Sequence, residues 1–185
     1  GLLLINQPNF GATWGDYDND GHVDVFLTMR SLEFPNRLFR NNGDGTFTDK
    51  SSFAGISDEG HLSFCASFID YDKDGYQDIY IANDRIVTKN IMYHNKGDGT
   101  FSDASDVTST ALSMDAMSTA IGDYNNDGWM DIYITNTNYV YPNGETGNVL
   151  LKNNGNGTFA NVSEETETTF DSVAWGAVFL DAEND

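Results

Sequence analysis

An acidic nine-residue segment recurs three times along this chain, and its spacing limits the folds that the chain can adopt. The copies read DYDNDGHVD at residues 16–24, DYDKDGYQD at 70–78 and DYNNDGWMD at 123–131. A fourth copy begins at Asp181 and stops at Asp185, before the glycine. The first aspartates of successive copies lie 54, 53 and 58 residues apart. Repeats of about 20 to 50 residues or slightly more indicate an array or a propeller.

A glycine-rich segment follows each complete acidic copy in a fixed register. It reads NGDGTF at residues 42–47, KGDGTF at 96–101 and NGNGTF at 154–159. Its phenylalanine lies 23 residues after the acidic copy in the first two repeats and 28 residues after it in the third. The five extra residues form an insertion near residues 138–147. Two motifs that keep step over three repeats define one structural unit.

Each repeat has the residue pattern of four short strands joined by turns. β-branched and aromatic residues fill the strands, glycines supply the positive φ of tight turns, and no segment has helical periodicity. Four antiparallel strands in each repeat predict an all-β fold made of β-propeller blades. The expected strands are residues 12–15, 66–69, 119–122 and 177–180 before the acidic copies, 25–28, 79–82 and 132–135 after them, 37–40, 90–93 and 148–151 next, and short strands at Phe47, Phe101 and Phe159.

The repeat divides the chain into blades. We expect residues 1–10 to be the tail of a preceding element, residues 11–62, 63–116 and 117–171 to be three blades, and residues 172–185 to hold the first strand and partial acidic loop of a fourth. A closed ring needs about four to eight blades. We therefore expect further blades outside this sequence; completion by neighbouring chains is the alternative.

The acidic copies have the donor pattern of calcium-binding loops. Ca²⁺ takes six to eight oxygen ligands at about 2.3–2.6 Å in a flexible geometry. Alternate acidic residues would present carboxylates on one side of a tight turn, and the residue after the glycine would offer its backbone carbonyl. That residue is His, Tyr or Trp, so its side chain is not a predicted ligand. The predicted ligands are Asp16, Asp18, Asp20, His22 and Asp24 in the first loop, Asp70, Asp72, Asp74, Tyr76 and Asp78 in the second, and Asp123, Asn125, Asp127, Trp129 and Asp131 in the third.

Three calcium sites are therefore predicted. Asn125 lowers the ligand charge of the third loop, which predicts weaker binding there. Asp181, Glu183 and Asp185 form a partial fourth site that residues beyond this sequence would have to complete. Without a cation the carboxylates of a loop repel one another, so we expect the ion to order the loop. The alternative is a set of aspartate-rich surface turns that bind no metal.

Other metal-binding motifs fit less well. Mg²⁺ prefers a strict octahedron and keeps its waters. Zinc and copper favour His or Cys ligands, which are absent from the carboxylate positions. An EF-hand loop needs a glutamate at its twelfth position, where this chain has Leu27, Ile81 and Ile134 in predicted strands.

The acidic loops together with the Asn-Gly-Asp-Gly-Thr-Phe segment resemble the FG-GAP or VCBS repeat family, which includes the integrin α-subunit propeller. The resemblance covers residues 11–185. It implies a seven-bladed propeller, calcium between the first two strands of a blade, and a secreted or cell-surface location. It implies no particular ligand.

Composition excludes several classes of partner. The net charge of −20 argues against binding to nucleic acid or to an anionic membrane, because both need a basic surface. No apolar run reaches the roughly 18 residues of a membrane-spanning helix, and residues 1–5 are too short for a signal peptide. The single cysteine, Cys65, allows no internal disulfide, and we expect it to be a small buried apolar residue.

A binding or scaffold role is predicted in place of an enzymatic one, because the three histidines are scattered and no nucleophile motif is present. The insertion at residues 138–147 should lie on the face opposite the calcium loops, where Tyr139 and Tyr141 could contact a partner; a loop without a role is the alternative. Two function classes follow. One is a calcium-stabilised extracellular module that recognises a protein or glycan, and the other is a self-assembling subunit of a surface layer or filament.

Overall fold

Twelve β-strands in three four-stranded sheets make up the regular structure of the residues that the structure describes. The structure is a computed structural model that describes residues 7, 9–57, 59–170 and 172–180. Within these ranges there is no helix long and apolar enough to cross a membrane. The all-β prediction is confirmed.

Each sheet corresponds to one repeat of the sequence, and we call the sheets blades 1 to 3. The strands are β1 (Asn9–Gly15), β2 (Asp24–Met29), β3 (Arg37–Asn41) and β4 (Phe47–Asp49) in blade 1, β5 (Ser63–Ile69), β6 (Asp78–Asn83), β7 (Ile91–Asn95) and β8 (Phe101–Asp103) in blade 2, and β9 (Ser118–Gly122), β10 (Asp131–Thr135), β11 (Val149–Asn153) and β12 (Phe159–Asn161) in blade 3. The described residues form these three blades and not a closed ring.

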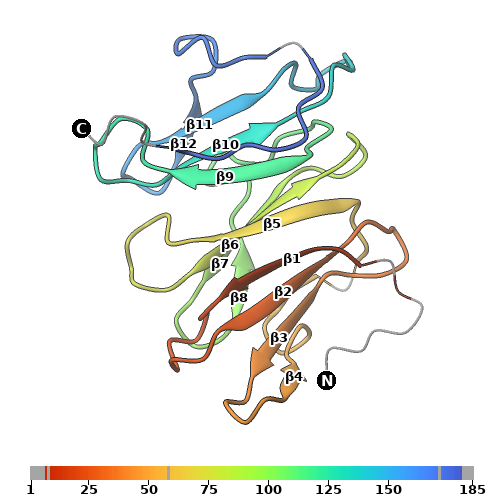
Figure 1. The fold of residues 1–185 in the computed structure, drawn as a ribbon, viewed down its shortest axis with the longest axis vertical. Helices are drawn as coiled ribbons and strands as arrows, with labels where there is room; N and C mark the ends of the chain where they lie inside the picture. Colours follow the sequence, from red (N-terminus) through yellow and green to blue (C-terminus); the bar gives the residue numbers. More distant parts are fainter. Residues whose placement is uncertain (1–6, 8, 58, 171, 181–185) are drawn as a thin grey trace.

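The strands of a blade follow one another across the sheet in sequence order and run antiparallel (Figure 1). This order places the acidic loop and the glycine-rich turn at the same end of each blade. The insertion at residues 138–147 joins β10 to β11 and lies at the opposite end. The register also repeats, because Gly15, Ile69 and Gly122 each pair with the last aspartate of their own acidic loop.

The hydrophobic core lies between the blades. Strand β6 is buried on both faces: Ile79 and Ile81 pack with Phe26 and Leu38 of blade 1, while Tyr80 packs toward blade 3. Alternate residues of a strand point to opposite faces of its sheet, so a strand between two sheets needs apolar residues on both. This explains why the second strands read as continuous apolar runs.

Neighbouring blades also share a repeated polar contact, which we call the inter-blade junction. The Asn95 side chain of blade 2 donates to the carbonyl of Tyr17 in blade 1 at 2.8 Å, and the Phe101 ring lies 5.8 Å from the Tyr17 ring. Asn153 donates to the Tyr71 carbonyl at 2.8 Å in the same way, and Phe159 lies against Tyr71. The second residue of each of the first two acidic loops is thus a contact point for the next blade.

The expected first strand of a fourth blade, residues 177–180, is not a strand. A strand is defined by hydrogen bonds to a partner, and residues 177–180 pair with no strand among the described residues. The segment still packs as its counterparts do. A side chain at Gly122 would collide with the Phe179 ring, as one at Gly15 would collide with Phe68.

The junction predicts unequal effects of two equivalent substitutions. Asn95→Ala removes the donor to the buried Tyr17 carbonyl, whereas the Asn41 side-chain amide donates only within blade 1, to Val23. We expect Asn95→Ala to lower the free energy of unfolding by about 1–3 kcal/mol more than Asn41→Ala, because a buried carbonyl loses its partner. Urea denaturation of the two variants measures the difference. Equal losses of unfolding free energy in the two variants would show that the hydrogen bond from Asn95 to Tyr17 does not stabilise the fold.

Candidate metal sites

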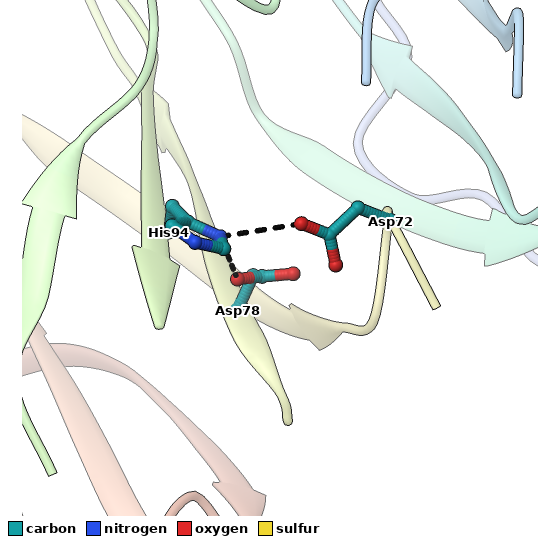
Figure 2. Close-up of side chains that lie close together, drawn as sticks. All are labelled: Asp72, Asp78 and His94. Atoms are coloured by element: carbon teal, nitrogen blue, oxygen red, sulfur yellow. Dashed lines mark ion pairs between the residues drawn. The ribbon is translucent and has the colours of Figure 1, made fainter. Parts of the chain in front are cut away.

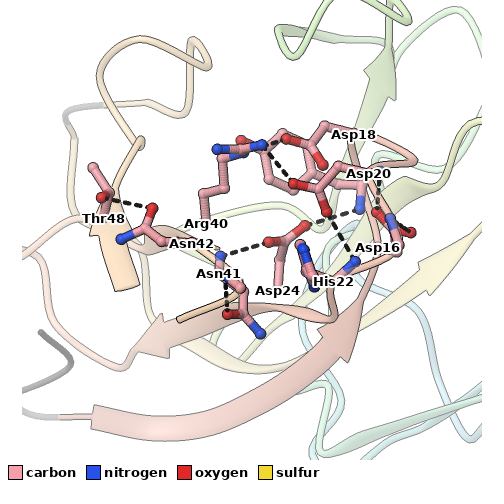
Figure 3. A network of polar contacts seen from close by, with 12 residues as sticks. Asp16, Asp18, Asp20, His22, Asp24, Arg40, Asn41, Asn42 and Thr48 are labelled. Carbon is pink, nitrogen blue, oxygen red and sulfur yellow. Dashed lines mark hydrogen bonds and ion pairs between the residues drawn. The ribbon is translucent and has the colours of Figure 1, made fainter. Parts of the chain in front are cut away.

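Each acidic loop is held in a tight turn by its own carboxylates. The first aspartate accepts the backbone N–H of the loop glycine, from Gly21 to Asp16 at 2.9 Å in the first loop and from Gly128 to Asp123 at 2.7 Å in the third. Gly21 has a φ of 87°, a region that residues with a side chain rarely adopt. These bonds bend the loop so that its alternate aspartates lie on one side (Figure 3).

The last aspartate of each loop is fully buried at the start of the second strand. Asp24 accepts the backbone N–H of Tyr17 at 3.2 Å and that of Asn41 at 2.7 Å. Asp78 and Asp131 accept the equivalent pair of N–H groups in blades 2 and 3. One carboxylate therefore ties the start of the loop to the third strand.

Burial makes the charged form of these aspartates costly. It raises the pKa of Asp24 to about 6 and that of Asp78 to about 7, and it also raises the pKa of Asp131. The backbone N–H groups oppose this shift without cancelling it. A bound cation would stabilise the carboxylate form instead.

Two of the three loops gather carboxylate oxygens closely enough for one ion. Oxygens of Asp16, Asp18 and Asp24 lie within 4.8 Å of one another, as do oxygens of Asp70, Asp72 and Asp74. One oxygen of Asp18 and one of Asp70 are buried without a hydrogen-bond partner. A donor set made of oxygens, with buried acceptors left over, fits a hard cation such as Ca²⁺.

The third loop is arranged differently. Among the described residues of this loop, no three His, Cys or acidic side chains have ligand atoms within 4.8 Å of one another. The backbone N–H of Trp129 lowers the pKa of Asp127, and the Asn125 side chain, which donates to Asp127 at 2.9 Å, lowers it further. The Asn125 side-chain amide is thus a neutral hydrogen-bond partner for Asp127. This is the loop in which the sequence predicts weaker calcium binding.

The ring after each loop glycine lies over the glycine-rich turn of its own blade. A side chain at Gly43, Gly97 or Gly155 would collide with the ring of His22, Tyr76 or Trp129, respectively. The sequence prediction assigned only the backbone carbonyl of these residues to the metal. Their side chains pack the two turns of a blade together.

Sequence reasoning missed one basic residue beside each loop. Arg40 of β3 contacts Asp18 at 2.6 Å and Asp20 at 2.5 Å (Figure 3). His94 of β7 lies beside Asp72 and Asp78, and Lys152 of β11 lies 4.0 Å from Asp127. The three occupy the same register position, opposite Thr48, Ser102 and Ala160. The signal was present in the sequence, since each stands two residues before the glycine-rich segment.

Neighbouring acidic loops contact each other. Asn19 of the first loop donates to the carbonyl of Gly75 in the second at 2.9 Å. Lys73 of the second loop places its ammonium 4.2 Å from the ring centre of Trp129 in the third. Asn19 and Lys73 share the fourth loop position and both have a positive φ.

The insertion presents one of its two tyrosines to solvent. Tyr139 is 61% exposed, whereas the Tyr141 hydroxyl donates to the buried Asp115 at 3.1 Å. Tyr139 also lines a cleft of about 400 Å³. Asp181, Glu183 and Asp185, the predicted partial site, lie outside the described residues.

The comparisons with known proteins agree with this architecture. The model of the FG-GAP-like repeat family matches residues 16–81 and 70–134, which together make up more than half of the chain. The comparison with curated proteins found no match. Each matched range starts at the first aspartate of an acidic loop and ends in the second strand of the next blade. The chain belongs to the FG-GAP-like repeat family.

Proposed function

We propose that this chain is a calcium-stabilised extracellular module that recognises a protein or glycan, and that it is not an enzyme. The observation that carries the proposal is the convergence of three carboxylates in each of two loops, with buried oxygens left without partners. Blades of the FG-GAP-like family supply the scaffold.

Calcium would be held by the aspartates of each loop and by the backbone carbonyl of the residue after its glycine. The ion would supply positive charge that lets the buried last aspartate remain ionised. It would also fix the loop that carries the inter-blade junction. Repeats of this family are often extracellular, where calcium is abundant enough for weak sites of about 10⁻⁴–10⁻³ M.

Recognition is assigned to the face opposite the calcium loops. The insertion adds an exposed tyrosine, a 77%-exposed valine at Val140 and an adjoining cleft. Aromatic side chains supply much of the binding energy at interfaces. We assign the carboxylates on the loop face to metal binding and not to acid–base catalysis.

Calcium titration tests the metal sites. We expect isothermal titration calorimetry to show uptake at the first two loops and weaker uptake at the third. Asp18→Asn should remove or weaken one of the stronger sites, while Asp106→Asn, an exposed aspartate outside the loops, should change nothing. No calcium-dependent heat with the unmodified chain would overturn the proposal.

Calcium should also reverse the pH dependence of stability. The folded state holds protons on Asp24 and Asp78 up to pH values near 6 and 7, whereas the ordinary pKa is 3.8. The contribution of these two carboxyl groups to metal-free stability should therefore be fully present below about pH 4 and be lost as the pH rises from about 4 to about 7, by at least about 1 kcal/mol, or about 2–4 °C in Tm. Added calcium should raise Tm more at pH 8 than at pH 5. Thermal unfolding with calcium or chelator measures both effects, and a calcium shift independent of pH would contradict the role of these carboxylates.

The recognition face makes a separate prediction. Tyr139→Ala should reduce binding by tenfold or more on a glycan array or on a panel of immobilised extracellular proteins, with Tm unchanged, since a hot-spot tyrosine typically contributes about 2 kcal/mol. Tyr141→Phe serves as the control, because it removes the hydrogen bond to Asp115 and leaves the exposed ring of Tyr139 in place. Binding that survives Tyr139→Ala would place recognition elsewhere.

A further inference from the structure

The basic residue beside each acidic loop differs in chemistry from blade to blade. Arg40 and Lys152 are cations that cannot bind a metal at neutral pH. His94 carries an imidazole, whose neutral nitrogen is the commonest transition-metal ligand in proteins. Blade 2 therefore places a nitrogen donor where the other blades place a charge.

The three polar side chains of blade 2 have the separations of a metal site. The Nδ1 atom of His94 lies 3.2 Å from Asp78 Oδ1 and 3.5 Å from Asp72 Oδ2 (Figure 2). Ligands bound at about 2.0–2.2 Å around a tetrahedral zinc ion lie roughly 3.3–3.6 Å apart. Donor atoms of all three residues lie within 4.8 Å of one another. An ion of this size fits with little movement of the ligands.

The nitrogen atom is held in place and has no hydrogen-bond partner. His94 Nδ1 is buried and unpartnered, and it faces the two carboxylates (Figure 2). The His94 ring meets the edge of Tyr71 at 5.9 Å. Asp78 is fully buried, and the N–H groups of Tyr71 and Asn95 fix its two oxygens. Supporting hydrogen bonds of this kind orient the ligands of metal sites.

We propose that blade 2 contains a mixed nitrogen–oxygen site, formed by Asp72, Asp78 and His94, that binds Zn²⁺ or a similar transition-metal dication. Three protein ligands leave a fourth position for water. Asp72 and Asp78 are shared with the second calcium loop, so zinc and calcium exclude each other there. That competition rests on the proposed function, whereas zinc binding itself does not.

Zinc titration of the full chain tests the site. We expect one zinc ion to bind the unmodified chain, and His94→Gln to weaken this binding by more than about 100-fold, since loss of a supporting residue alone costs about 10–100-fold. His61→Gln, at a histidine outside the acidic loops, should leave zinc binding unchanged. His94→Arg, which installs the residue of blade 1, should also abolish it while the circular dichroism spectrum shows that the fold is kept.

Cobalt gives an independent readout, because its visible absorption reports nitrogen and oxygen ligands in a tetrahedral geometry. The visible absorption should appear when cobalt is added to the unmodified chain and should be absent with His94→Gln. Added zinc should displace the cobalt and remove the absorption. Equal zinc affinity in the unmodified chain and His94→Gln, or no zinc binding by a folded chain, would overturn the proposal. If the chain binds calcium but not zinc, the proposed function stands and the zinc site is wrong. If the chain binds zinc, loses it on His94→Gln and binds no calcium, the zinc site stands and the proposed function is wrong.

Discussion

The rest of the structure depends on one buried carboxylate in each blade. Asp24, Asp78 and Asp131 are removed from water, and each receives one N–H from the start of its loop and one from the third strand. The bonds set the path of the acidic loop and the register between loop and sheet. Because burial disfavours the negative charge, a positive ion or a proton at the loop would stabilise the folded state.

The same loops also take part in the packing of one blade on the next. Tyr71 shows the connection most clearly: its N–H binds Asp78, its carbonyl accepts from Asn153 of the following blade, and its ring contacts Phe159. If this loop becomes more or less ordered, both the candidate metal ligands and the core between the blades are affected. The candidate metal site and the packing between blades therefore share residues.

The repeat was enough to predict the four-stranded sheets, the order of their strands and the gathering of carboxylates in the first two loops. The third loop shows no such cluster among its described residues. Local pattern could not predict that residues 177–180 remain outside a sheet, because a strand depends on a partner that the pattern does not supply. It also did not reveal Arg40, His94 and Lys152 as neighbours of the loops, since that contact depends on how the third strand is placed against the first turn. The aligned basic residues become meaningful only when the register is known.

The direct contacts between successive loops have a consequence for the proposed binding of ions. Asn19 holds the backbone of the second loop, and Lys73 holds the indole of the third. Ordering one loop therefore lowers the entropic cost of ordering the next, which is the thermodynamic basis of positive cooperativity. The occupancy of the three acidic loops would therefore rise more steeply with cation concentration than the occupancy of isolated sites of the same intrinsic affinity.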